Sequence, residues 1–157
     1  MIRNEAEDVL NSLLVDLFND ILKIEGSVLK AGEFSDLSVT EMHIIEAIGH
    51  DREMTMTEVA RDLEITVGTL TTAINRLIKK EYVERRRIEE DRRVVLIKLT
   101  SKGEEAFKSH AQFHDDMIKS IMKELPKDEE GVLISFLKRM VNFFETKYNL
   151  HKWSSKF

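Results

Sequence analysis

The chain has 157 residues, which is enough for one domain with a hydrophobic core but too few for two independent ones. It contains no cysteine, which excludes a disulfide framework, a thiolate zinc site and a cysteine redox switch, and its single proline is typical of a helix-rich protein. Its formal net charge of -5 argues against a nucleic-acid partner only if the charges are evenly spread, and they are not.

The sequence also bears on location and on catalysis. No apolar run reaches about 18 residues, the length of a membrane-spanning helix, and residues 1–5 lack the apolar block of a signal peptide. A cytoplasmic protein without a membrane partner is therefore expected. No nucleophile, oxyanion loop or glycine-rich phosphate loop stands out, which argues against an enzyme.

Two helices are predicted in the first third of the chain. Apolar residues recur every three or four positions over residues 4–29, which predicts a long helix that ends where Gly32 takes a left-handed conformation. Ser38 and Glu41 have the spacing of a capping box, in which each side chain caps an amide at a helix start. They predict a second helix that runs to about Gly49.

Residues 55–80 contain two further helix-start signals. Thr55 and Glu58 form another capping box for a short helix that ends near Leu63, and Thr66 can cap a helix that ends near Lys80. The apolar face of this last helix is predicted to hold Val67, Leu70, Ile74, Leu77 and Ile78. Its other face carries hydroxyls, an amide and a guanidinium, which suit phosphates, base edges and thymine methyls in a DNA major groove. The candidate DNA contacts there are Thr66, Thr69, Thr71, Thr72, Asn75 and Arg76.

Residues 82–88 and 93–99 predict two strands joined by a charged turn. From residue 76 to residue 98 there are nine Lys or Arg against five Asp or Glu, a net charge of +4 in a chain of net charge -5. A basic segment in an acidic protein is the electrostatic footprint of a polyphosphate site. Because successive strand side chains alternate in direction, either Arg86 or its neighbours Arg85 and Arg87 should face inward or sideways.

The last third predicts two more helices. Thr100 caps the first, which should stop at Leu125 because the residue before a proline avoids helical geometry. Pro126 should sit in the opening turn of the second, which extends to about Tyr148. The terminal helices are more apolar than one small domain needs, and this surplus predicts a homodimer. Two-fold symmetry then predicts a pseudo-palindromic DNA site with half-sites about 10 to 10.5 base pairs apart.

The hairpin carries a known signature. Asp91-Arg92-Arg93, followed by five residues and then Leu99-Thr100, fits the D-x-R-x5-L-T wing of the MarR transcriptional regulators, and residues 99–103 resemble the L-T-x-K-G that continues it. The resemblance covers about residues 10–148. It implies a single MarR-type domain over residues 1–157, mainly α with a small β wing. In it, helices over 4–30 and 101–148 form a dimerisation domain and residues 38–100 form a winged helix-turn-helix that binds double-stranded DNA.

The same resemblance assigns roles within the hairpin. Asp91 is expected to orient the wing by pairing with Arg93, which leaves Arg92 free to enter a minor groove. Arg86 is a further candidate contact to DNA.

Two shorter stretches, residues 38–43 and 65–72, resemble the branch of the family that represses fatty-acid biosynthesis genes, the FabT branch. This implies a repressor with a long-chain acyl group on acyl carrier protein as co-repressor, and no resident cofactor. The expected effector pocket is formed by Leu17, Ile21, Ile24, Met42, His43, Ile45, Phe107 and Phe113.

Other functions remain open at this point. The protein could be a repressor released by a small aromatic or phenolic ligand, or one that responds to a metal. His110 and His114 lie four residues apart on one helical face, but two imidazoles rarely make a complete site, so no metal is expected. A winged-helix interaction module that never touches DNA is disfavoured by the basic wing.

Overall fold

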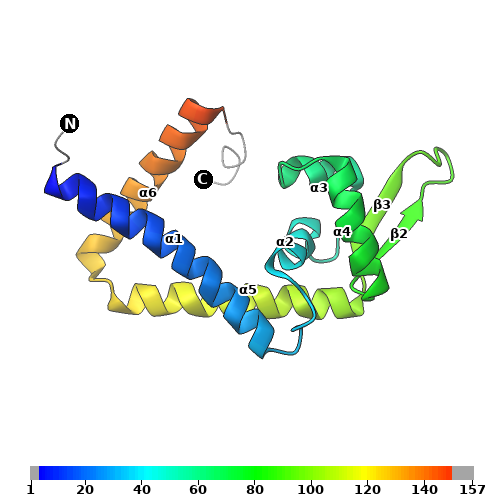
Figure 1. The fold of residues 1–157 in the computed structure, drawn as a ribbon, viewed down its shortest axis with the longest axis horizontal. Coiled ribbons are helices and arrows are strands. Elements are labelled where there is room, and N and C mark those ends of the chain that lie inside the picture. Colours follow the sequence, from blue (N-terminus) through cyan, green and yellow to red (C-terminus); the bar gives the residue numbers. More distant parts are fainter. Residues whose placement is uncertain (1–3, 150–157) are drawn as a thin grey trace. The chain divides into compact units, whose positions relative to one another are not determined.

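A computed structural model describes residues 4–149. The described chain is mainly helical and has one small antiparallel sheet with the strand order β1-β3-β2, which confirms the predicted fold class. It divides after residue 107 into two compact units. In chain order (Figure 1) the elements are α1 (Glu5–Ala31), α2 (Val39–Ile48), β1 (Met54–Thr55), α3 (Met56–Asp62), α4 (Val67–Lys79), β2 (Val83–Arg87), β3 (Val95–Leu99), α5 (Ser101–Glu124) and α6 (Lys127–Tyr148).

The helix starts follow the local sequence signals. At α2, the Ser38 amide donates to Glu41 Oε2 at 2.9 Å and the Glu41 amide donates to Ser38 Oγ at 3.1 Å. At α3, Thr55 and Glu58 form the same reciprocal pair. Thr66 caps α4 by accepting a hydrogen bond from the amide of Thr69 at 3.1 Å. Both predicted capping boxes and the predicted cap of α4 are confirmed.

Three local predictions were wrong. Gly32 ends α1 with φ of -94° and ψ of -173°, an extended rather than a left-handed conformation, and its amide donates to the carbonyl of Leu29. Pro126 is the residue just before α6, not a member of its first turn. Val67 is 45 % exposed, because it lies in the first turn of α4, outside the buried face.

The first unit, up to residue 107, contains the hydrophobic core. α2, α3, α4 and the sheet contribute side chains with no exposed surface, among them Ile45, Val59, Leu70 and Ile97. Tyr82 joins them, and its hydroxyl donates to Asp36 Oδ1 at 2.6 Å. Burial and this hydrogen bond to a carboxylate raise the pKa of Tyr82. The core therefore holds helices α3 and α4 against the base of the β2-β3 hairpin.

Helices α1 and α6 leave most of their apolar side chains exposed. α6 contains no buried residue, and the buried residue of α1 is the polar Glu25. No helix in the described part of the chain is long and apolar enough to cross a membrane. The large exposed apolar residues of these two helices are Val9, Leu10, Leu13, Val15, Leu17, Phe18, Leu22, Ile24, Val28, Val132, Ile134, Phe136, Leu137, Phe143, Phe144 and Tyr148.

Candidate nucleic-acid interface

Helix α4 presents a polar face that is free of acidic side chains. Leu70, Ile74 and Leu77 bury the opposite face in the core, which fixes the rotation of the helix about its axis. As a result Asn75 and Arg76 are exposed. Of the other predicted contacts, Thr66, Thr69 and Thr72 are exposed and Thr71 is half-buried.

The threonine hydroxyls of α4 use their protons within the helix. Thr71 Oγ1 donates to the carbonyl of Val67 at 2.8 Å, and Thr72 Oγ1 donates to the carbonyl of Gly68 at 3.3 Å. Each hydroxyl then has lone pairs and an adjacent methyl group left for a ligand. On DNA these groups can accept a hydrogen bond from a base amino group or contact a thymine methyl.

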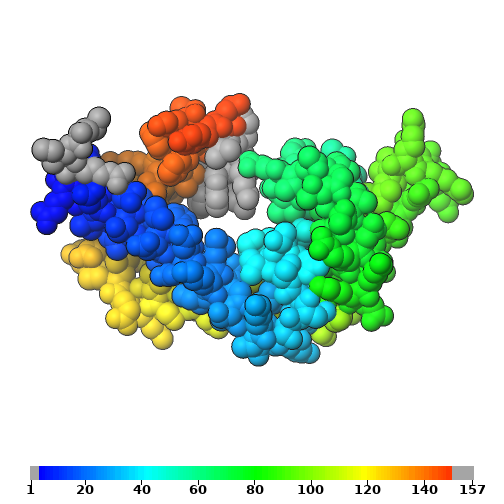
Figure 2. Space-filling view, in the orientation of Figure 1, coloured from blue at the N-terminus to red at the C-terminus, as the bar shows by residue number. Residues whose placement is uncertain are grey.

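The β2-β3 hairpin forms the wing. Its register pairs Val83 with Leu99, Arg85 with Ile97 and Arg87 with Val95. Val83 is the one buried residue of β2, and all three of its arginines are exposed. Figure 2 shows the hairpin, in yellow-green, standing clear of the rest of the first unit. None of these arginines faces inward, because the hairpin extends beyond the core after Val83, but Arg85 and Arg86 point to different sides of the strand, as the predicted alternation requires.

One side of the wing has its charges paired. Arg86 grips Glu53 with two parallel hydrogen bonds, Nε to Oε1 at 2.8 Å and an Nη to Oε2 at 2.7 Å. These hydrogen bonds lower the pKa of Glu53 and raise that of Arg86. Beside them Lys98 pairs with Glu84 at 2.9 Å. Arg86, a predicted DNA contact, is thus engaged by a carboxylate that lies just before β1.

Arg85 lies on the other side of β2 and contacts α4, the helix that carries the predicted DNA contacts and is called the recognition helix below. One of its Nη atoms donates to Asn75 Oδ1 at 3.0 Å. Sequence reasoning did not select Arg85. The signal that points to it is the burial of Val83, because residues two apart in a strand share a face and Val83 packs toward the helices.

The tip of the wing is closed by Asp91 and Arg93. The amide and Nε of Arg93 both donate to Asp91 Oδ1 at 3.1 Å, and this hydrogen bonding holds the pKa of the Asp91 carboxyl below its usual value. Arg92 between them is exposed, and within residues 4–149 no hydrogen bond or ion pair engages it. The side chains of Arg87 and Arg76 are likewise exposed and have no hydrogen bond or ion pair within residues 4–149. These three guanidinium groups have no partner to release before they bind phosphate.

The residues predicted to form an effector pocket have different surroundings. Met42 and Ile45 are buried in the core of the first unit, and Phe107 packs against that core. Leu17 and Ile24 are more than half exposed on α1, Ile21 is half-buried, and Phe113, also half-buried, belongs to the second unit.

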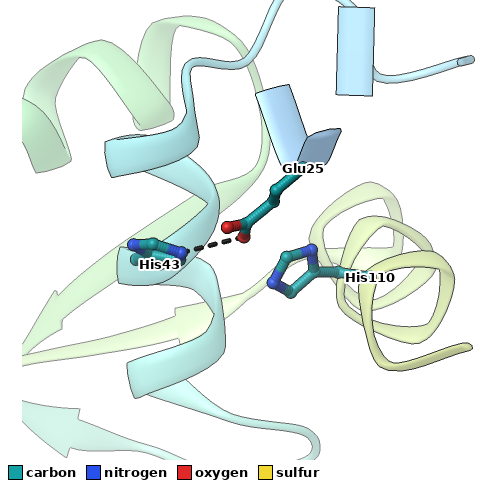
Figure 3. Close-up of side chains that lie close together, drawn as sticks. All are labelled: Glu25, His43 and His110. Carbon is teal, nitrogen blue, oxygen red and sulfur yellow. Dashed lines mark hydrogen bonds and ion pairs between the residues drawn. The ribbon is translucent and has the colours of Figure 1, made fainter. Parts of the chain in front are cut away.

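His43, the remaining member of that set, links two helices. Figure 3 shows His43 of α2 facing Glu25 of α1, with Nε2 of the imidazole 2.9 Å from Oε1 of the carboxylate. Glu25 is buried and His43 is half-buried. The contact gives the polar residue inside α1 a hydrogen-bonding partner on α2.

A cavity of about 530 Å³ lies at the base of the wing and is lined by none of the eight predicted pocket residues. Its walls are polar except for Leu99, which makes it unsuited to an acyl chain. The lining residues are Asp51, Arg52, Glu53, Glu84, Lys98, Leu99, Thr100, Ser101 and Glu104.

The two histidines considered for a metal lie in the second unit. Their Nε2 atoms are 3.0 Å apart, so one ring donates a hydrogen bond to the other, and His110 is buried while His114 is half-buried.

Comparison with known proteins places the chain. A model of the MarR family matches residues 37–95. The solved structure of Streptococcus pneumoniae FabT in complex with DNA has 37 % sequence identity and a TM-score of 0.85, over 89 % of this chain and 98 % of that one. The multiple antibiotic resistance protein MarR of Salmonella typhimurium is 26 % identical over 138 residues, which cover 80 % of this chain and 96 % of the relative.

A further relative, also a transcriptional regulator, matches over a shorter length. The HTH-type transcriptional regulator YdgJ of Bacillus subtilis is 26 % identical over 106 residues, or 68 % of this chain, and the match spans only 65 % of that relative's length. The chain therefore belongs to the MarR family of DNA-binding transcriptional regulators, and it is not an enzyme.

Proposed function

We propose that the protein is a homodimeric repressor of fatty-acid biosynthesis genes, with a long-chain acyl group on acyl carrier protein as co-repressor. The observation that carries the proposal is the likeness to FabT, which extends over nearly the whole of both chains at 37 % identity. The stretches 38–43 and 65–72, which resemble the fatty-acid branch, form the start of α2 and the capped start of α4.

The exposed apolar faces of α1 and α6 support the homodimer. Phe18 of α1 is 62 % exposed and Val132 of α6 is 70 % exposed, and each lies among other large apolar side chains of its helix. Monomeric proteins rarely expose apolar patches of this kind. A second copy of the chain would cover them and would place two α4 helices on a pseudo-palindromic operator.

The DNA-binding mode follows from the two exposed elements. Helix α4 would enter the major groove with Thr66, Thr69, Thr71, Thr72, Asn75 and Arg76, and Arg92 would enter the adjacent minor groove from the wing tip. Asp91 and Arg93 would hold that tip in shape. Each phosphate neutralised by a cation should contribute about -0.9 to the salt slope of the logarithm of the binding constant.

The co-repressor must bind one arrangement of the dimer better than the others. A ligand shifts a conformational equilibrium only by its difference in affinity between the two states. Met42, Ile45 and Phe107 lie in or against one core in the first unit, which supports them as neighbours in the proposed effector pocket.

The test is fluorescence anisotropy of the protein on a labelled fatty-acid-synthesis promoter fragment, titrated with and without long-chain acyl carrier protein at two salt concentrations. The carrier without an acyl group and a scrambled duplex serve as controls. Salt-sensitive, site-specific binding that the acylated carrier tightens and the unacylated carrier does not is the expected result. Site-specific binding that ignores the acyl group would refute the co-repressor, and no specific binding would refute the proposed target genes.

A further inference from the structure

The contact between Arg85 and Asn75 fixes which hydrogen-bonding groups the recognition helix offers to a base. Asn75 is an exposed residue of α4, one helical turn beyond Thr71 and Thr72. Its amide carries an oxygen that accepts and an NH₂ group that donates. A guanidinium can only donate, so the amide atom that faces Arg85 at 3.0 Å must be the oxygen.

The rest of the amide is therefore a donor. With Oδ1 held toward the wing, the NH₂ group of Asn75 is the part left to meet the DNA. An asparagine that reads adenine uses both atoms together, accepting from N6 and donating to N7. Guanine instead presents two acceptors, N7 and O6, on its major-groove edge.

The threonines near Asn75 offer hydrogen-bond acceptors and methyl groups rather than donors. Thr71 and Thr72 spend their hydroxyl protons on backbone carbonyls of α4, which leaves acceptors and methyl groups. Arg76 next to Asn75 has no acceptor. A contact from outside the helix therefore decides which hydrogen-bonding groups Asn75 offers to a base. With the contact Asn75 offers a donor alone, and without it a donor and an acceptor together.

We propose that Arg85 is a specificity-determining residue, which makes Asn75 a donor-only reader that selects guanine over adenine in each half-site. Arg85 acts through Asn75 and is a positioning residue for it. This inference rests on DNA binding by α4 but not on the target genes or on the co-repressor.

The chain offers a matched control for Arg85. Arg87 lies two residues along the same strand, shares its face, and is also exposed. No hydrogen bond or ion pair engages the side chain of Arg87 among the described residues. Arg85→Met and Arg87→Met remove the same charge from the same face, but only the first releases the amide oxygen of Asn75.

The experiment is selection of binding sites from a random duplex library by the wild-type protein and by the Asn75→Ala, Arg85→Met and Arg87→Met variants, without acyl carrier protein. Asn75→Ala identifies the base pair that Asn75 reads, as the position whose preference disappears. At that position the wild type should prefer guanine to adenine by about tenfold. Arg85→Met should lose this preference or shift it toward adenine, whereas Arg87→Met should keep it. Melting curves check that every variant folds.

Four results would overturn the proposal. The wild type could select adenine at that position, Asn75→Ala could change no position, Arg85→Met could retain the guanine preference, or the two methionine variants could change it equally. If the wild type selects no site at all, sequence-specific reading fails together with the proposal. Failure of the fatty-acid target or of the acyl co-repressor leaves the selected sites unchanged, so the two failures are distinguishable.

Discussion

Arg92 and Arg86 are both exposed arginines of the wing, but they differ in what holds them. Arg92 has no partner among residues 4–149, whereas Arg86 grips Glu53 with two hydrogen bonds. We expect Arg92→Ala to weaken operator binding and to reduce the magnitude of the salt slope by about one, because the DNA interface loses one cation that displaces counterions. Arg86→Ala should leave the slope nearly unchanged. Anisotropy titrations over a series of KCl concentrations measure both, and equal slopes for the two variants would contradict the assignment.

Gly103 allows the first turn of α5 to approach the backbone at the base of the wing. A Cβ at this position would lie 2.1 Å from the carbonyl oxygen of Tyr82, and a backbone atom cannot move aside cheaply. We expect Gly103→Ala to destabilise the fold by about 3 kcal/mol or more.

The matched control for this change is Gly131 of α6. A Cβ there meets nothing within 4 Å, so Gly131→Ala should be neutral or stabilising by up to about 1 kcal/mol. Urea unfolding of both variants measures the difference. A mild loss of stability in Gly103→Ala would show that the backbone at Tyr82 can yield.

The sequence does not predict which face of β2 each wing arginine occupies. Alternation along a strand follows from the backbone, but Tyr82 and Val83 are both apolar and both buried, so the sequence does not say which of them sets the inward phase. That phase depends on where the hairpin leaves the core, which is a tertiary property. Alternation alone therefore did not identify Arg85 as the arginine that contacts α4.

At the scale of elements, an ion pair between buried Glu41 and half-buried Lys80 joins the start of α2 to the residue that follows α4. Glu41 accepts from Nζ of Lys80 at 2.8 Å and from the amide of Ser38. Burial alone would raise the pKa of Glu41, but the hydrogen bonds from Lys80 and Ser38 outweigh it and lower that pKa below its ordinary value of 4.5.

This pair predicts an acid-dependent loss of stability. A carboxyl whose pKa is lower in the folded state stabilises the fold above its unfolded pKa, and the stabilisation is lost as the pH falls through the folded value. We expect Glu41→Gln to cost about 1–2 kcal/mol near neutral pH and to show a shallower decline in stability below about pH 4.5. Urea unfolding across this pH range measures it, and parallel pH profiles for the two proteins would refute a role for Glu41.

Elements with local start signals were predictable and the paired elements were less so. The capping boxes at Ser38 and Thr55 involve residues three apart, so the sequence contains both partners. β1 has two residues, and its partners in β3, Ile97 and Leu96, lie more than 40 positions away. No local pattern marks so short a strand.

At the scale of the whole molecule, the apolar faces of the terminal helices predict the oligomeric state. Phe18 is 62 % exposed on α1, so it contributes little to the core of its own chain. We expect Phe18→Asp to yield a folded monomer with weaker binding to a palindromic operator. Val67→Asp, an equally polar change at an exposed position of α4, should leave the protein dimeric. Sedimentation velocity distinguishes these outcomes, and a dimeric Phe18→Asp would exclude this part of α1 from the interface.

The effector pocket illustrates the limit of sequence reasoning at this scale. The family resemblance implied a pocket that includes Leu17, Ile24, Met42 and Ile45, all on the apolar sides of their predicted helices. The structure buries the last two in the core and leaves the first two more than half exposed on α1. Periodicity reports which side of a helix is apolar, but it does not distinguish a side chain that fills a core from one that waits for a ligand or a partner.

The Leu-Thr-x-Lys-Gly stretch by which the family can be recognised surrounds Tyr82. Leu99 is buried, Thr100 donates from Oγ1 to the carbonyl of Glu81, Lys102 donates to the carbonyl of Lys80 and lies over the Tyr82 ring, and Gly103 permits the close approach. These residues mount the wing on the first turn of α5, and none of them lies on the polar face of α4. The signature shared by the family therefore indicates the same attachment of the wing to α5, and it does not indicate that its members bind the same operator. The exposed residues of α4 could accordingly be exchanged for those of another regulator, which would change the DNA sequence that is read without changing the packing around Tyr82.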